Sequence, residues 1–165
     1  MKSISGRIHI FGDNVDTDQI YPGRYIELTE PEDIKHHAME GVDTSFAGSV
    51  QRGDFIVAGT NFGCGSSREH AVITLKSVGV SAVVAKSFSR IFYRNAINQG
   101  LIVVEVPSLD QENLNNGDIF TIDVKMGVIT SSDGKEWHFT PLPCNIIDIL
   151  EAGGVFKLYH KYPKS

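Results

Sequence analysis

The chain has 165 residues, of which 41% are hydrophobic and 21% are charged, the composition of an ordinary globular protein. Its net charge of -5 argues against a surface for nucleic acid or for an anionic membrane. No apolar run approaches the roughly 18 residues of a membrane span and no basic-then-apolar leader opens the chain, so we expect a cytoplasmic protein with a single domain over residues 1–165. Cys64 and Cys144 are too few for a disulfide framework, or for an iron–sulfur cluster held by this chain alone, which needs about four cysteine ligands.

The N-terminal segment predicts a strand followed by a polar turn. Residues 4–10 alternate loosely between apolar and polar side chains, as a half-buried strand does. Asp13, Asp16 and Asp18 then place three carboxylates within six residues, a feature shared with calcium loops. An EF-hand loop needs glycine at its sixth position and glutamate at its twelfth, where this segment has Asp18 and Arg24. We therefore interpret the three aspartates as part of a polar turn.

A short helix is expected to follow. It begins at Pro31, because proline is favoured at the first helical position and two acidic residues come next. We expect Gly41 to close it. His36 and His37 are neighbours, which point about 100° apart on a helix and cannot share a metal ion, so we interpret them as a solvated helix face.

The segment of greatest chemical interest spans residues 59–70, with the sequence Gly-Thr-Asn-Phe-Gly-Cys-Gly-Ser-Ser-Arg-Glu-His. It lies between an apolar run and a helical pattern, which puts Ser66, Ser67 and Arg68 at or near a helix start. Backbone N–H groups there have no intrahelical partner, and with a guanidinium beside them they suit a carboxylate or a phosphate. The nucleotide-binding glycine patterns and the G-x-S-x-G elbow are absent. The alternative is that Ser66 or Ser67 simply caps the helix.

Strands and helices alternate between residues 55 and 104. The apolar runs that predict buried strands are 55–58, 82–85 and 101–104. The residues that predict the two intervening helix faces are Ala71, Leu75 and Val78, and then Phe88, Ile91, Phe92 and Ala96, with Gly100 as the end of the second helix. This alternation predicts βαβ crossovers and a parallel core.

The C-terminal part has a different pattern. Short segments separated by glycine-containing turns predict a β-meander over residues 118–125, 128–130 and 135–139. A last helix is predicted from Ile146, Ile147 and Leu150, and it ends at Gly153 and Gly154. The predicted fold class is therefore α/β, with a mixed, partly parallel sheet flanked by helices and a C-terminal β-meander plus helix.

Four segments occur in the same order as in a known family. They are residues 12–18, 59–70, 85–95 and 151–154. Over nearly its whole length, the chain resembles the small subunit of the isopropylmalate isomerase and homoaconitase group, which is equivalent to the swivel domain of aconitase. The resemblance implies a swivelling β/β/α domain. It also implies a hydro-lyase that reversibly dehydrates a hydroxy-di- or tricarboxylic acid.

The resemblance further implies a partner and roles for individual residues. A 4Fe-4S cluster on a separate large subunit would bind the substrate as a Lewis acid, in a heterodimer or heterotetramer, while this chain holds no metal or cofactor. Ser66 would be the base that removes the proton next to a carboxylate. Ser67 and Arg68 would bind substrate carboxylate, and Asp18 would support the base.

The substrate's variable group is expected to contact Tyr25, Ile26, Glu27 and Leu28. By the resemblance, homoaconitase-like members have an arginine in this stretch and isopropylmalate isomerases have apolar residues. Glu27 departs from both patterns and would repel a third carboxylate, which disfavours homocitrate and citrate. Ile26 and Leu28 suit an alkyl group, so the first choice is isomerisation of 2- to 3-isopropylmalate in leucine biosynthesis. The alternatives are a 2,3-dimethylmalate dehydratase, a homoaconitase-type subunit, or a Glu27 that faces solvent and selects nothing.

Two hypotheses come from other classes of function. The chain could be a non-catalytic regulatory domain that binds a dicarboxylate. It could also be a stand-alone enzyme with Ser66 as nucleophile and His70 as its base, although no third orienting group is evident. We interpret Cys64 as a small residue that fills a tight loop.

Overall fold

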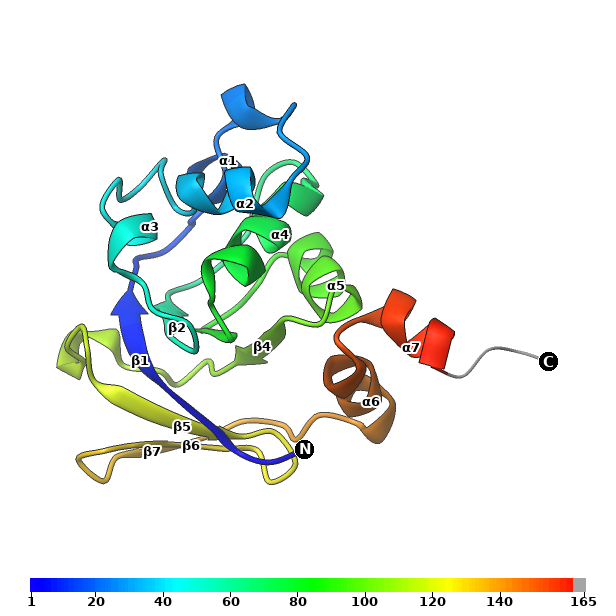
Figure 1. Ribbon diagram of the computed structural model, residues 1–165. Helices are drawn as coiled ribbons and strands as arrows, with labels where there is room; N and C mark the ends of the chain where they lie inside the picture. Colours follow the sequence, from blue (N-terminus) through cyan, green and yellow to red (C-terminus); the bar gives the residue numbers. More distant parts are fainter. Residues whose placement is uncertain (162–165) are drawn as a thin grey trace.

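The strands form one sheet in the order β4-β3-β2-β1-β5-β6-β7 in a computed structural model that describes residues 1–161 (Figure 1). They are β1 (Ile4–Ile10), β2 (Phe55–Ala58), β3 (Ala82–Ala85), β4 (Ile102–Glu105), β5 (Ile119–Asp123), β6 (Val128–Ser131) and β7 (Glu136–His138). Neighbours from β1 to β4 pair in parallel, and β1, β5, β6 and β7 pair antiparallel. This confirms the mixed, partly parallel sheet and the meander.

The helices confirm the βαβ crossovers. They are α1 (Thr17–Ile20), α2 (Pro31–Ile34), α3 (Phe46–Ser49), α4 (Glu69–Val78), α5 (Arg90–Asn98), α6 (Cys144–Ala152) and α7 (Val155–Lys161), with the 3-10 turns η1 (Gly23–Tyr25), η2 (Lys35–His37) and η3 (Gln111–Asn113). Helix α4 connects β2 to β3, and α5 connects β3 to β4. Figure 1 shows α1 to α4 above the strands and α6 and α7 beside α5.

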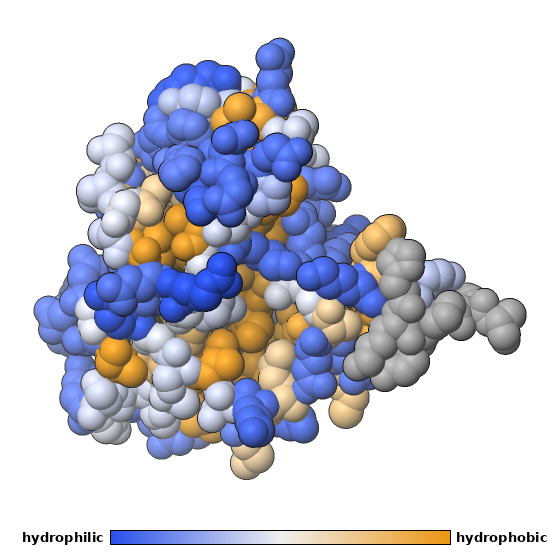
Figure 2. Space-filling model, viewed as in Figure 1, coloured by the Kyte–Doolittle hydropathy of each residue, from blue (hydrophilic) through white to orange (hydrophobic). Residues whose placement is uncertain are grey.

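Burial explains why the central strands are short apolar runs. Every side chain of β2 and β3 is buried, as expected for a parallel sheet covered on both faces. Phe55 lies opposite Ile8 of β1 and opposite Ala82 of β3. Figure 2 shows hydrophilic side chains over most of the visible face, with hydrophobic ones gathered in its central hollow. Among the described residues, no helix has the length and apolarity needed to cross a membrane.

The helix expected from Pro31 to Gly41 ends earlier than predicted. It becomes the 3-10 turn η2 and stops at His37. The chain then turns onto α1, where the Met39 N–H donates to the carbonyl of Ile20 at 2.7 Å and the Gly41 N–H to that of Gln19 at 3.0 Å. Met39 is fully buried, so core packing and these two hydrogen bonds replace a longer helix.

Three smaller expectations were wrong. His37 does not belong to a solvated face, because its ring stacks on Tyr25 with the ring centroids 3.5 Å apart. Ile91 is 52% exposed and points away from the apolar face of α5. Helix α6 is not the last helix, since α7 follows it directly after the Gly154 turn.

Candidate active site

Residues 59–68, called the serine loop below, begin at the carboxyl end of β2. Ligand sites in parallel α/β sheets form beyond the carboxyl ends of the strands. The segment that follows β3 holds one side of the loop. The Asn61 N–H donates to Ser87 Oγ at 2.7 Å, and Ser89 Oγ donates to the carbonyl of Gly63 at 2.8 Å. Two neighbouring strand ends therefore fix the path of the loop.

The aspartate-rich turn holds the other side of the serine loop. The Gly63 N–H donates to the carbonyl of Val15 at 2.7 Å, and the Thr17 N–H donates to that of Cys64 at 2.8 Å. Asp16 starts α1 through a capping box with Gln19. The turn predicted from three aspartates is thus the partner of the serine loop.

Gly63 is needed for packing inside the loop. Its φ of +82° lies in the left-handed region, and a Cβ there would lie 2.3 Å from the Phe92 ring. The adjoining Phe62 is fully buried and meets Phe92 edge to face with the ring centroids 5.2 Å apart. These contacts anchor the loop so that the serines that follow lie at the surface.

Arg68 is held in a fixed position beside α1. Its Nη1 donates to Asp18 Oδ1 at 2.8 Å and to the carbonyl of Tyr21 at 3.2 Å, and its side chain is 23% exposed. The Gly23 N–H donates to the same Asp18 oxygen at 2.9 Å. The hydrogen bonds from Arg68 and from the Gly23 N–H lower the pKa of Asp18 below its ordinary value. Asp18 therefore stays ionised and orients the guanidinium.

Ser66 and Ser67 are exposed just before the first turn of α4. Arg68 occupies the N-cap position and makes no side-chain capping bond, so neither serine caps the helix and that alternative is wrong. Ser66 Oγ lies 3.4 Å from Thr17 Oγ1, and Thr17 is only 3% exposed. The hydroxyls of Ser66 and Thr17 thus lie near the start of α4, where Arg68 is the N-cap residue.

The predicted substrate-contacting stretch lies beside the same helix start. The carbonyl of Leu28 is 3.1 Å from His70 Nε2 on α4, and the Tyr25 hydroxyl donates to Glu40 Oε1 at 2.8 Å. Ile26 is 50% exposed and Glu27 is also exposed. The His70 ring contacts the Leu28 carbonyl and stacks on Tyr21 instead of meeting Ser66, which counts against a Ser66–His70 nucleophile pair.

The structure adds two groups that the sequence analysis missed. Thr17 supplies a hydroxyl beside Ser66, and Tyr21 supplies a carbonyl to Arg68. The Asp-Thr-Asp string was a possible signal for Thr17, because a hydroxyl stands there between two carboxylates. A backbone carbonyl such as that of Tyr21 leaves no signal in a sequence.

The residues of this chain do not fit an iron–sulfur cluster. Cys64 is half-buried in the serine loop, and Cys144 is exposed at the start of α6. Within residues 1–161, no group of three or more histidine, cysteine or acidic side chains is placed to hold a metal ion. What the serine loop does present is a guanidinium, Arg68, beside two exposed hydroxyls, Ser66 and Ser67.

The aconitase C-terminal domain family matches residues 13–109, which include the serine loop and strands β2 to β4. The 3-isopropylmalate dehydratase small subunit of Nautilia profundicola is 49% identical over 156 residues, which cover 94% of this chain and 93% of that protein. The corresponding small subunit 1 of Methanopyrus kandleri is 50% identical over 156 residues, which cover 94% of this chain and 91% of that protein.

A solved structure has the same fold. The crystal structure of 3-isopropylmalate dehydratase from Methanocaldococcus jannaschii matches with a TM-score of 0.89 and 46% identity, and covers 97% of this chain and 95% of that chain. The chain belongs to the family of 3-isopropylmalate dehydratase small subunits, which are hydro-lyase subunits of the aconitase type. This confirms the resemblance that we drew from residues 12–18, 59–70, 85–95 and 151–154.

Proposed function

We propose that this chain is the small subunit of a cytoplasmic iron–sulfur hydro-lyase that interconverts 2- and 3-isopropylmalate in leucine biosynthesis. The observation that carries the proposal is the meeting of Ser66, Ser67 and Arg68 at the start of α4, with Asp18 orienting the guanidinium. Relatives that match almost end to end are named for this reaction, which supports the choice of substrate.

Each group at the site has a task in this reaction. Arg68, Ser67 and the free N–H groups of the α4 start bind a substrate carboxylate, since a guanidinium and a helix start both attract anions. The alkoxide form of Ser66 Oγ accepts the proton from the carbon next to that carboxylate and so becomes the hydroxyl. A serine hydroxyl is a weak base, so it needs its anion stabilised. The Thr17 hydroxyl, Arg68 and the helix start supply that stabilisation.

The exposure of the site supports a need for a second chain. Electrostatic stabilisation of an anion is greatest where water is excluded, and both serines are exposed in this chain. We propose that a large subunit covers the serine loop and carries the 4Fe-4S cluster, for which the described residues offer no ligand set. The isolated chain is therefore expected to be inactive.

The 25–28 segment supports an alkyl-bearing substrate. Ile26 is half exposed beside the anion site and can pack on a branched alkyl group. The neighbouring Glu27 disfavours a third carboxylate by like-charge repulsion. The second candidate substrate is 2,3-dimethylmalate, whose smaller alkyl group leaves part of the Ile26 surface uncovered.

Co-purification with the cluster-bearing large subunit under anaerobic conditions, followed by a dehydration assay, tests the proposal. The acids compared are 3-isopropylmalate, 2,3-dimethylmalate, homocitrate and citrate. We expect turnover only with both chains and a preference for 3-isopropylmalate, and we expect Glu27→Arg to shift the preference towards homocitrate. Turnover by the pure chain alone would contradict the proposal. Binding of a dicarboxylate without turnover by a cluster-loaded complex would favour the regulatory domain.

A further inference from the structure

One carboxylate outside the serine loop collects three side chains. Glu40 Oε1 accepts from the Tyr25 hydroxyl at 2.8 Å and from Arg24 Nη2 at 2.7 Å, while Oε2 lies 2.6 Å from His37 Nδ1. The Glu40 side chain is only 20% exposed. Burial opposes its charge, but the hydrogen bonds from His37, Tyr25 and Arg24 keep its pKa below the ordinary value. Glu40 is therefore an ionised carboxylate that holds three neighbouring side chains together.

The three side chains held by Glu40 gather around Tyr25. The His37 ring stacks on the Tyr25 ring with the planes 15° apart, and the Arg24 guanidinium carbon lies 4.8 Å from the centre of the same ring. Both groups also contact Glu40. The carboxylate thus holds the hydroxyl end of Tyr25 directly and holds two groups that contact its ring.

Glu40 is itself fixed to the helix that carries Asp18. The residues on either side of it donate backbone hydrogen bonds to α1, from Met39 to Ile20 and from Gly41 to Gln19. The position of the carboxylate is therefore set relative to the anion site, although Glu40 has no contact with Ser66 or Arg68 among the described hydrogen bonds and ion pairs.

The ends of the segment held by Glu40 are attached to the anion site. A Cβ at Gly23 would lie 3.0 Å from Arg68 Nη2, so the chain passes close to the guanidinium and a larger residue here would press on it. At the other end, the Leu28 carbonyl meets His70 of α4. Between Gly23 and Leu28, the side chains of Ile26 and Glu27 are exposed. The preceding Tyr25 is hydrogen-bonded to Glu40.

We propose that Glu40 is a positioning residue for substrate selection. By holding Tyr25, it fixes the direction in which Ile26 and Glu27 face the variable group of the substrate, and it does so without touching the substrate. This inference rests on the proposed function, because it assigns the 25–28 segment to the variable group.

The test compares Glu40→Ala and Glu40→Gln with Glu32→Ala in the complex with the large subunit. Glu32 is a matched control, because its exposed carboxylate pairs with Lys35 on the next turn and, among the described hydrogen bonds and ion pairs, makes none with residues 21–28. For Glu40→Ala we expect KM for 3-isopropylmalate to rise about 10-fold and kcat to change less than about 3-fold, with a smaller preference over 2,3-dimethylmalate. Glu40→Gln keeps an oxygen acceptor for Tyr25, so we expect a smaller effect. The control should behave as the wild type.

A second readout separates positioning from general loss of structure. Hydrogen exchange of the unpartnered chain should show amides of residues 25–28 exchanging at least about 10-fold faster in Glu40→Ala, with the amides of α4 unchanged. Unchanged KM and unchanged substrate preference would overturn the inference, and so would faster exchange throughout the chain. A wild-type complex that turns over none of the acids would instead overturn the proposed function. In that case unchanged exchange at residues 25–28 would overturn the role of Glu40 as well.

Discussion

At the scale of single residues, Thr17 is the buried side chain whose hydroxyl lies beside Ser66. It is buried, and its hydroxyl lies 3.4 Å from Ser66 Oγ, a distance that can shorten when substrate and partner close the site. Thr17→Val keeps the shape and removes the hydroxyl. We expect kcat of the two-chain complex to fall roughly 10-fold with KM nearly unchanged, because on our proposal the Thr17 hydroxyl stabilises the reacting form of Ser66. Thr17→Ser should restore most of kcat, and a wild-type kcat in Thr17→Val would exclude the role.

At the scale of elements, the site depends on where parallel strands end. The loops after β2 and β3 meet at one edge of the sheet, where Asn61 and Ser87 join them. The start of α1 and the turn before it hold the other side, through Thr17 and Val15. The serine loop is therefore held at both sides by rigid elements. This geometry places Ser66 at the surface, on a loop whose backbone is hydrogen-bonded on both sides.

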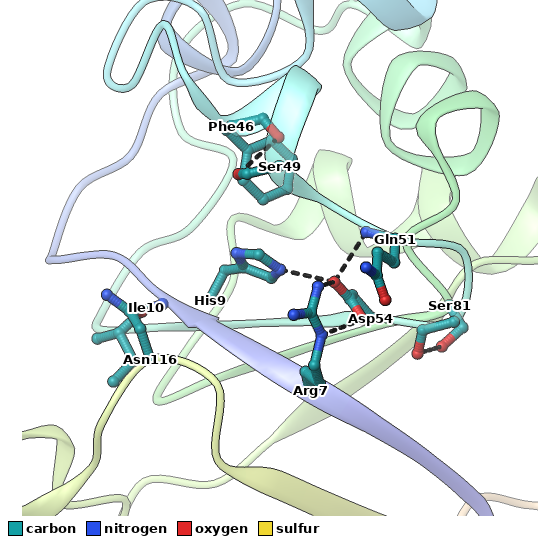
Figure 3. Close-up of polar contacts among 10 residues, drawn as sticks. Arg7, His9, Ile10, Phe46, Ser49, Gln51, Asp54, Ser81 and Asn116 are labelled. Carbon is teal, nitrogen blue, oxygen red and sulfur yellow. Dashed lines mark hydrogen bonds and ion pairs between the residues drawn. The ribbon is translucent and has the colours of Figure 1, made fainter.

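Strands β1 and β2 are also linked by the carboxylate of Asp54. Asp54, just before β2, accepts from Arg7 Nη2 at 2.9 Å and from the Gln51 N–H at 2.9 Å, and one of its oxygens lies 2.8 Å from His9 Nε2 (Figure 3). Asp54 is 4% exposed. Burial opposes its charge, but the hydrogen bonds from Arg7, His9 and Gln51 keep its pKa below the ordinary value. Asp54 therefore stabilises the folded chain in its ionised form.

This group gives a pH-dependent prediction for stability. Because its pKa is lower in the folded chain, Asp54 contributes fully above the unfolded value of about 3.9, and the contribution is lost as pH falls through the folded value. We expect Asp54→Asn to lower the free energy of unfolding by about 2 kcal/mol at pH 7 in urea titrations. The difference from the wild type should shrink at pH 3. Asp148→Asn, at an exposed position of α6, is the control, and a difference that grows at pH 3 would contradict the account.

At the scale of the whole molecule, apolar periodicity was sufficient to predict the sheet. Strands β2 and β3 are continuous apolar runs because both faces are covered, and β4 is apolar up to the exposed Glu105. Strands β5 to β7 are separated by glycine turns. Helix α7 was missed because it has seven residues and several of its apolar side chains are exposed, which leaves no clear amphipathic pattern.

The site could be predicted only in part. Ser66, Ser67 and Arg68 stand in one short motif, so a single segment of sequence identifies them. The contacts of Glu40 and His37 with Tyr25 depend on the chain turning back onto α1 after η2, and no local pattern in the sequence reports that turn. Residues that act through folding contacts therefore became visible only in the structure.

The central claim is that this chain supplies the base to a site completed by its partner. The most direct measurement is kcat for 3-isopropylmalate of the anaerobically assembled complex that carries Ser66→Ala, with Ser108→Ala as a control at an exposed serine. We predict normal co-purification with the large subunit and a loss in kcat of at least about 10²-fold, the scale expected for removing one catalytic group. Near-normal turnover by a fully assembled Ser66→Ala complex would contradict the account.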